Sequence, residues 1–164
     1  MNFALSMNGK IRFKFIIFVF LILNLNSCFN TNKKDPIMQN HNIPGKIITL
    51  SSLEEMFDSI NKKGIWDMSK PMLWGYFFTH QEPKKLDEAK VILVKKGYRF
   101  VDIYIAEKQD KNEPELWWLH VEKEEIHSPQ TLDKRNDELY LLANKLGLNS
   151  YDGMDVGPIQ QIKR

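Results

Sequence analysis

The sequence has little of what marks several large classes of protein. It contains one cysteine among 164 residues, so no disulfide can form within the chain. Its longest apolar run, 15–23, is too short for a membrane-spanning helix, which takes about 20 residues. It has no glycine-rich phosphate loop and no nucleophile-turn motif. The 23 basic and 21 acidic residues nearly balance, which gives no support for nucleic-acid binding by net charge.

The single cysteine, Cys28, stands where a bacterial lipoprotein is cleaved and acylated. Three basic residues precede the apolar run 15–23, and the sequence Leu25-Asn26-Ser27-Cys28 follows it. A basic start, a short apolar run and a small residue before the cut are the parts of a secretory signal. Leu25 and Ser27 resemble the lipobox that ends in a lipid-modified cysteine. We therefore predict a lipoprotein signal peptide at 1–27, with Met7 as an alternative start, and palmitate on Cys28.

A lipidated Cys28 determines where the protein works. Cleavage before it leaves 20 basic against 21 acidic residues, so the formal positive charge belongs to the signal. Two or more acyl chains give stable anchoring to a membrane. Phe29 follows the cysteine, in place of the aspartate associated with inner-membrane retention, which favours the periplasmic face of the outer membrane. The alternative is an ordinary signal or a short anchor helix with an incidental cysteine.

The rest of the chain divides into a tether and one domain. Residues 28–46 are rich in asparagine and proline without an apolar period, which predicts a lipidated tether. The domain is expected at 47–164. It opens with an amphipathic helix at about 52–63, because Ser52 and Glu55 form a capping-box pattern and Gly64 suits the end. The apolar face of this helix carries Leu53, Met56, Phe57 and Ile60.

The pattern after Pro71 predicts six elements in the order βαββαβ. Alternation and helical spacing place strands at 72–79, 98–106, 116–123 and 151–156, and helices at 83–96 and 129–146. Ser128 before Pro129 is typical of a helix start, and Gly147 of a helix end. We therefore predict an α+β, ferredoxin-like sandwich with both helices on one face of an antiparallel sheet.

Three short segments carry a resemblance to a known family. They are Tyr76-Phe77-Phe78 before the first helix, Lys96-Gly97-Tyr98 at the entry to a strand, and Tyr151-Asp152-Gly153 near the end. In their order and spacing, over 73–157, the chain resembles the regulator of ribonuclease E activity B family, whose domain is a ribonuclease E inhibitor. The segment 115–127 looks typical of an uncharacterised branch, which together with Cys28 indicates a lipoprotein branch. The resemblance implies a ferredoxin-like fold and a partner that is ribonuclease E.

Two departures from the family change the expected partner. The namesake carries a strongly acidic tail, whereas this chain ends Gln160-Gln161-Ile162-Lys163-Arg164. Ribonuclease E is cytoplasmic, and an acylated, secreted domain would not meet it. We therefore expect a lipid-anchored, extracytoplasmic protein-binding module that is not an enzyme. The alternatives are an inhibitor of a ribonuclease, either ribonuclease E-like or a toxin nuclease, and a small metal-dependent enzyme.

Strand parity predicts which residues face away from the helices. Val101, Ile103, Ile105, Trp117, Leu119 and Val121 are expected to face the helices. The candidate binding face is then Trp74, Tyr76, Phe78, Phe100, Asp102, Tyr104, Trp118, His120 and Glu122. A patch this apolar is expected to be covered by another segment or molecule. The candidates are the N-terminal helix, a homodimer or protein partner, and a small ligand held by Tyr104, His120 and Asp102.

Two more specific functions, RNA binding and metal or acid–base chemistry, are not expected for this face. Aromatic residues on a four-stranded sheet are how some domains stack RNA bases, but Asp102 and Glu122 would repel phosphate, so no nucleic-acid partner is expected. A histidine with two carboxylates suits zinc or a general base. The spacing of His120, Asp102 and Glu122 is, however, that of ordinary strand alternation. We therefore predict no catalytic residue, no metal and no cofactor.

Overall fold

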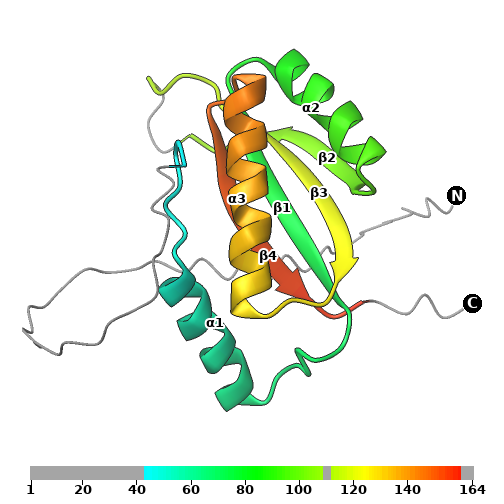
Figure 1. Cartoon of the computed structure of the whole chain (residues 1–164). Helices are drawn as coiled ribbons and strands as arrows, with labels where there is room; N and C mark the ends of the chain where they lie inside the picture. Colours follow the sequence, from blue (N-terminus) through cyan, green and yellow to red (C-terminus); the bar gives the residue numbers. More distant parts are fainter. Residues whose placement is uncertain (1–42, 109–111, 160–164) are drawn as a thin grey trace, which may run out of the picture. The chain divides into compact units, whose positions relative to one another are not determined.

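The elements follow one another along the chain as the sequence predicts. The computed structural model describes residues 43–108 and 112–159 (Figure 1). The elements are α1 (Leu50–Lys63), β1 (Met72–His80), α2 (Pro83–Lys95), β2 (Arg99–Ile105), β3 (Trp117–Glu125), α3 (Pro129–Leu146) and β4 (Ser150–Gly157). The βαββαβ order and the additional N-terminal helix are confirmed. Cys28, the predicted signal and most of the predicted tether lie outside the described residues.

Both long helices begin at capping boxes that the local sequence dictates. At α3, the Ser128 side chain accepts the amide N–H of Thr131, and the Thr131 hydroxyl accepts that of Ser128. At α1 the cap is Thr49, whose side chain accepts the N–H of Ser52 at 3.2 Å. Ser52 is therefore the third helical residue and not the cap that we predicted, and α1 begins at Leu50. Such reciprocal caps satisfy amide donors that the first turn leaves without partners.

The four strands form one antiparallel sheet in the order β2-β3-β1-β4. This order places β3 between β1 and β2, as expected for a ferredoxin-like fold. In the register of β1 and β3, Tyr76 pairs with Val121 and Phe78 with Leu119. Paired residues on neighbouring strands project from the same face of a sheet, so this register assigns every strand side chain to one face or the other.

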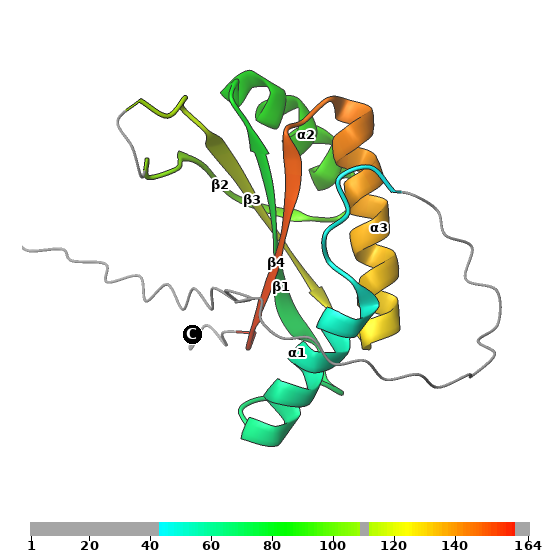
Figure 2. The same ribbon diagram turned by 90° about the vertical axis from the view of Figure 1, so that its left-hand side faces the viewer.

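All three described helices lie on the same side of the sheet (Figure 2). α1 packs beside α3, with Leu53 and Phe57 buried. The ring of Phe57 stacks on that of Trp74 at 6.2 Å between centroids. The N-terminal helix thus extends the helix layer, and the interpretation that it folds over the opposite face is wrong. None of the helices in the described part of the chain is both long and apolar enough to cross a bilayer.

The predicted face of β1 is corrected by the structure. Trp74, Tyr76 and Phe78 are completely buried against the helices, on the same side as Leu119 and Val121. They belong to the core and not to the candidate binding face. The reason is that both faces of β1 are apolar, so alternation alone does not show which set faces the helices.

The predicted face of Phe100 is also corrected. The register of β2 shifts between Phe100 and Asp102, so Val101 is the extra residue of a β-bulge and Phe100 pairs with Val121 on the helix side. There the ammonium group of Lys90, on α2, lies 5.0 Å from the centre of the Phe100 ring. After the bulge the parity is as predicted, since Ile103 pairs with Leu119 and Asp102 with His120.

Candidate functional site

The face of the sheet opposite the helices, here called the open face, is the candidate site. Five of the predicted residues lie on it: Asp102, Tyr104, Trp118, His120 and Glu122. The register adds five more residues that the sequence analysis did not include: Leu73, Gly75, Phe77 and Thr79 from β1, and Asp155 from β4. Among the described residues no helix packs on this face (Figure 2).

A row of rings crosses the open face over three strands. Tyr104 of β2 stacks on Trp118 of β3 at 6.3 Å, and Trp118 meets Phe77 of β1 edge-on at 5.9 Å. Phe77 in turn stacks on His120 at 4.5 Å. The four rings support one another through cross-strand pairs, which fixes their rotamers and makes a rigid apolar strip.

The indole of Trp118 carries an unsatisfied donor. Its Nε1 is buried and has no hydrogen-bond acceptor among the residues that the structure describes. A buried donor without an acceptor costs about 1–3 kcal/mol. This donor is therefore available to an acceptor on a partner.

Carboxylates surround the row of rings. Glu122 forms an ion pair with Arg99 across β2 and β3, and its other oxygen lies 3.5 Å from Nε2 of His120. Desolvation raises the pKa of Glu122, and the nearby charge of Asp155 adds to the rise while Arg99 opposes it. Desolvation likewise raises the pKa of Asp155 and of Asp152, which lies in a bulge of β4. These acids are therefore under-compensated in the isolated domain.

Gly75 allows the acidic and aromatic groups to meet. The Asp155 carboxylate accepts the backbone N–H of Gly75 at 3.1 Å and lies over β1. A Cβ atom at position 75 would collide with Oδ1 of Asp155 and would lie 2.8 Å from Nε2 of His120. A glycine inside a central strand often marks such a close approach, and this is the sequence signal by which Gly75 and its partner could have been found.

A second polar cluster lies on the helix side, at the end of β3. Glu125 accepts hydrogen bonds from Arg135 of α3 at 2.7 Å and from the hydroxyl of Tyr76 at 3.1 Å. His127 contacts both Glu125, at 3.2 Å, and Tyr76, at 3.4 Å. The Lys123 ammonium completes the cluster at 3.1 Å from Glu125. His127 itself is buried among these partners.

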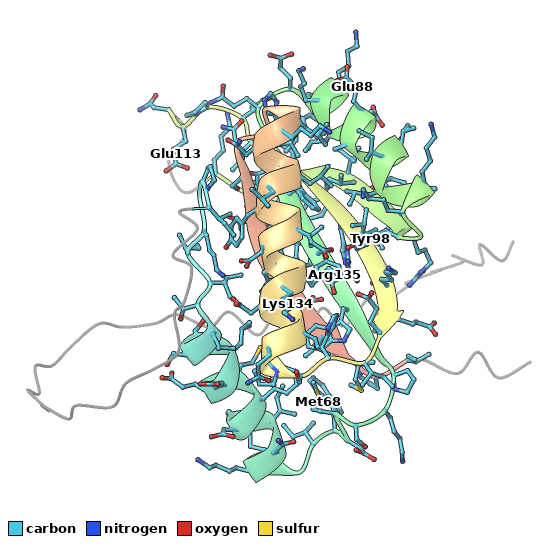
Figure 3. The ribbon with its side chains drawn as sticks, viewed as in Figure 1. Met68, Glu88, Tyr98, Glu113, Lys134 and Arg135 are labelled. Atoms are coloured by element: carbon cyan, nitrogen blue, oxygen red, sulfur yellow. The ribbon has the colours of Figure 1, made fainter. Side chains whose placement is uncertain are left out.

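The pKa of Glu125 shows that the charges of this internal cluster are balanced. Burial by itself would raise the pKa of Glu125, but the hydrogen bonds from His127 and Lys123 and the charge of Arg135 lower it to about 2. Burial raises the pKa of Tyr98 to about 12, although the charge of Arg135 opposes the rise; the two side chains are labelled in Figure 3. This cluster joins β3, β1 and α3, so we assign it to the stability of the fold.

The residues that the structure describes offer no ready metal centre. Within them, no three His, Cys, Asp or Glu side chains are grouped so that they could hold a metal ion. His120, Asp102 and Glu122 share the open face, as predicted, but His120 stacks on Phe77 and Glu122 pairs with Arg99. The face thus combines a row of rings with acidic groups.

Comparison with known proteins gives one clear result. The family model described as regulator of ribonuclease activity B matches residues 51–156, which run from the first turn of α1 to the last residues of β4. No curated protein matches the sequence. The family match therefore covers every helix and strand of the described domain, including the N-terminal helix that the sequence pattern alone treats as an addition.

Proposed function

The chain belongs to the regulator of ribonuclease activity B family, and from this premise we propose that it is a regulatory module that acts by protein contact through its open face. The observation that carries the proposal is the rigid row of Tyr104, Trp118, Phe77 and His120 on a face that no described helix covers. Aromatic side chains held in place before binding are enriched at the centres of protein interfaces.

The proposal is that of a binding module and not of an enzyme. Regulation by contact requires a rigid surface, which the paired rings provide, and does not require a proton acceptor or a metal. The most suitable acid–base group, His120, is stacked on Phe77 and lies beside Glu122. Its position supports the strip more directly than it supports chemistry on a substrate.

We further propose that the module is a lipoprotein held at the periplasmic face of the outer membrane. The support is in the sequence, where three basic residues, the apolar run 15–23 and Ser27 lead to Cys28. Residues 28–46 would then form the tether between the acylated cysteine and the domain, whose described part begins at Ile43. In this arrangement the partner is an extracytoplasmic protein.

Metabolic labelling with palmitate tests the anchor. The full chain is expressed in a bacterium with two membranes, beside Cys28→Ser and the control Asn30→Ala, which leaves the cleavage sequence unchanged. We expect label and envelope fractionation for the full chain and the control, and neither for Cys28→Ser. Full-length, unlabelled protein in the cytoplasm would contradict the anchor and would make cytoplasmic ribonuclease E the partner to test.

Site-specific crosslinking tests the contact face. A photoreactive residue replaces Asp102 on the open face or Glu88 on the outer side of α2 (Figure 3); both positions are exposed. We expect a discrete protein adduct from position 102 and none from position 88. Adducts from position 88 alone would show that the helix layer, and not the open face, makes the contact.

The family description favours a second candidate function, which is inhibition of a ribonuclease. The nuclease would be ribonuclease E-like or an extracytoplasmic toxin. The protein identified by crosslinking decides between the two functions, because a nuclease partner can be assayed for RNA cleavage with and without the purified chain. A drop in cleavage with the full chain, absent with Trp118→Ala, would establish inhibition through the open face.

A further inference from the structure

We propose that the open face binds an arginine-rich segment of its partner, with guanidinium groups lying on the rings of Trp118 and Tyr104 and pairing with Asp155 and Glu122. This inference rests on the proposed function, because it takes the open face to be the contact surface. It goes further by naming the chemistry of the segment that docks there.

The first support is the imbalance of charge on this face. Strand register and the β4 bulge place five carboxylates on it or at its edge: Asp102, Glu122, Glu124, Asp152 and Asp155. Within residues 43–108 and 112–159, Arg99 is the one lysine or arginine that strand register assigns to it, and Arg99 is already paired with Glu122. A cationic segment complements this surface, and a nucleic acid would be repelled by it.

The second support is the state of these acids. The pKa values of Glu122, Asp152 and Asp155 are all raised, first by desolvation. Burial raises the pKa of the Tyr104 hydroxyl, and the charges of Asp102, Asp155 and Asp152 add to the rise. A positive group placed among them would stabilise carboxylates that burial leaves poorly solvated in the isolated domain, which favours docking of a cationic segment.

The third support selects arginine over lysine. A guanidinium stacks flat on an aromatic ring and forms paired hydrogen bonds with a carboxylate at the same time, whereas an ammonium group is a point charge without a planar fork. The open face presents both kinds of partner, since Trp118 and Tyr104 are stacked and the Asp155 and Glu122 carboxylates lie next to His120, the neighbour of Trp118 on this face of β3. A segment with several arginines therefore uses the rings and the acids together.

Gly75 makes Asp155 a preorganised partner for the guanidinium. The Asp155 carboxylate is held by the N–H of Gly75, in a space that any side chain at position 75 would fill. Its position over β1 is thus fixed by the backbone before binding. Fixed acceptors gain more from a bidentate contact than mobile ones do, because less side-chain entropy is lost when the contact forms.

Fluorescence anisotropy with three labelled peptides tests the inference. The peptides alternate serine with arginine, lysine or the uncharged arginine analogue citrulline, and they are added to the purified full chain. We expect the arginine peptide to bind about tenfold more tightly than the lysine peptide, and the citrulline peptide not to bind. Affinity should fall when the ionic strength rises from about 0.01 M to 0.15 M. Equal affinity for the arginine and lysine peptides would overturn the proposal.

Variants locate the binding. Asp155→Asn and Glu88→Gln each remove one negative charge, the first on the open face and the second on the outer side of α2 (Figure 3). We expect Asp155→Asn to weaken the arginine peptide about tenfold and Glu88→Gln to leave it unchanged. Equal losses would show general attraction to an acidic protein and overturn the proposal. Trp118→Leu should reduce the preference for arginine over lysine while leaving the charge unchanged.

Gly75→Ala gives a second route that does not alter charge. The added methyl group displaces Asp155 and His120, so binding should fall as in Asp155→Asn. If Gly75→Ala does not fold, the Asp155→Asn result still decides.

Light scattering tests whether a second copy of the chain occupies the open face instead. A dimer that dissociates in Trp118→Leu would place a second copy on the face and overturn the proposal. If the arginine peptide fails while position 102 still crosslinks a protein, this inference is wrong and the proposed function stands. If both fail, the proposed function is wrong.

Discussion

Glu122 and Glu125 are three residues apart on β3, but they lie on opposite faces of the sheet and differ in how their charge is balanced. On the helix side, Glu125 has Arg135, Lys123 and His127 around it, and its pKa falls to about 2. On the open face, Glu122 has Arg99 as its basic partner, but desolvation and the nearby charge of Asp155 raise its pKa. The domain thus satisfies its internal acid and leaves its surface acids under-compensated.

This difference separates groups that hold the fold from groups that are available for contact. A buried acid without partners would destabilise the domain strongly, so the chain supplies cations from two elements. The open face bears a smaller cost, because solvent screens its charges in part. Such a surface also carries the buried indole N–H of Trp118, which has no acceptor within residues 43–108 and 112–159, and it gains most when a complementary partner binds.

The largest expected effect is a difference in stability between replacing Trp74, on the helix side of the sheet, and Trp118, on the open face. Trp74→Ala removes a completely buried side chain that stacks on Phe57, and it should lower the free energy of unfolding by about 3–5 kcal/mol. Trp118→Ala removes a ring of the open face and should lower it by about 1 kcal/mol, since the ring is only partly buried. Urea unfolding followed by circular dichroism measures both. Equal losses would mean that the open face is part of the core.

The next largest effect is on the internal cluster, and it is tested by replacing two neighbouring basic residues of α3, Arg135 and Lys134. Arg135→Met removes the cation that bonds Glu125 and should cost about 2–3 kcal/mol of unfolding free energy, because Lys123 and His127 compensate only in part. Lys134→Met, at an exposed position of the same helix, is the matched control and should change stability by less than about 0.5 kcal/mol (Figure 3). If Arg135→Met changed the unfolding free energy as little as Lys134→Met does, the cluster would not stabilise the fold.

The two faces should also respond to pH in opposite directions. Glu125 has a lowered pKa, so its contribution to stability is present above its ordinary value of 4.5 and is lost as the pH falls toward 2. Glu122 and Asp155 have raised pKa values, so the folded state binds their protons more tightly and they favour folding as the pH falls through those values.

Unfolding free energies between pH 3 and 7 measure these contributions. Glu125→Gln should flatten the loss of stability on the acid side by about 1–2 kcal/mol, a figure reduced for the partial exposure of the site. Asp155→Asn should steepen that loss slightly, because it removes an acid that opposes it. Parallel profiles for the two variants would contradict the assignment of opposite pKa shifts.

The sequence predicts the elements well because their boundaries depend on local chemistry. Ser128 and Gly147 mark the ends of α3, and the alternation of Ile103 and Leu119 identifies core positions of β2 and β3. The face of β1 depends on packing that the sequence does not show, since both of its faces are apolar. The bulge at Val101 likewise depends on pairing with β3, and it moved Phe100 to the other side.

Strand alternation in the sequence could have predicted the internal cluster around Glu125. The alternation that places Leu119 and Val121 toward the helices continues to Lys123 and Glu125, which puts two charged residues on a buried face. Charged residues in such positions require partners, and the helix that follows is where they would be expected. The pairing of Gly75 with Asp155 left a weaker signal, because it depends on the register of β4 and not on the pattern of either strand.

The smallest expected effect on stability is the most informative about the open face. Asn at position 155 retains an oxygen that accepts the N–H of Gly75 and loses the charge that repels Glu122. Asp155→Asn should therefore leave the unfolding free energy at pH 7 unchanged or raise it by about 0.5 kcal/mol, as expected where binding groups are retained at a cost to stability. Thermal and urea unfolding measure the change, with Glu88→Gln as the control. A loss above about 1 kcal/mol would show that Asp155 holds the sheet together, and the acids of the open face would then be structural like Glu125.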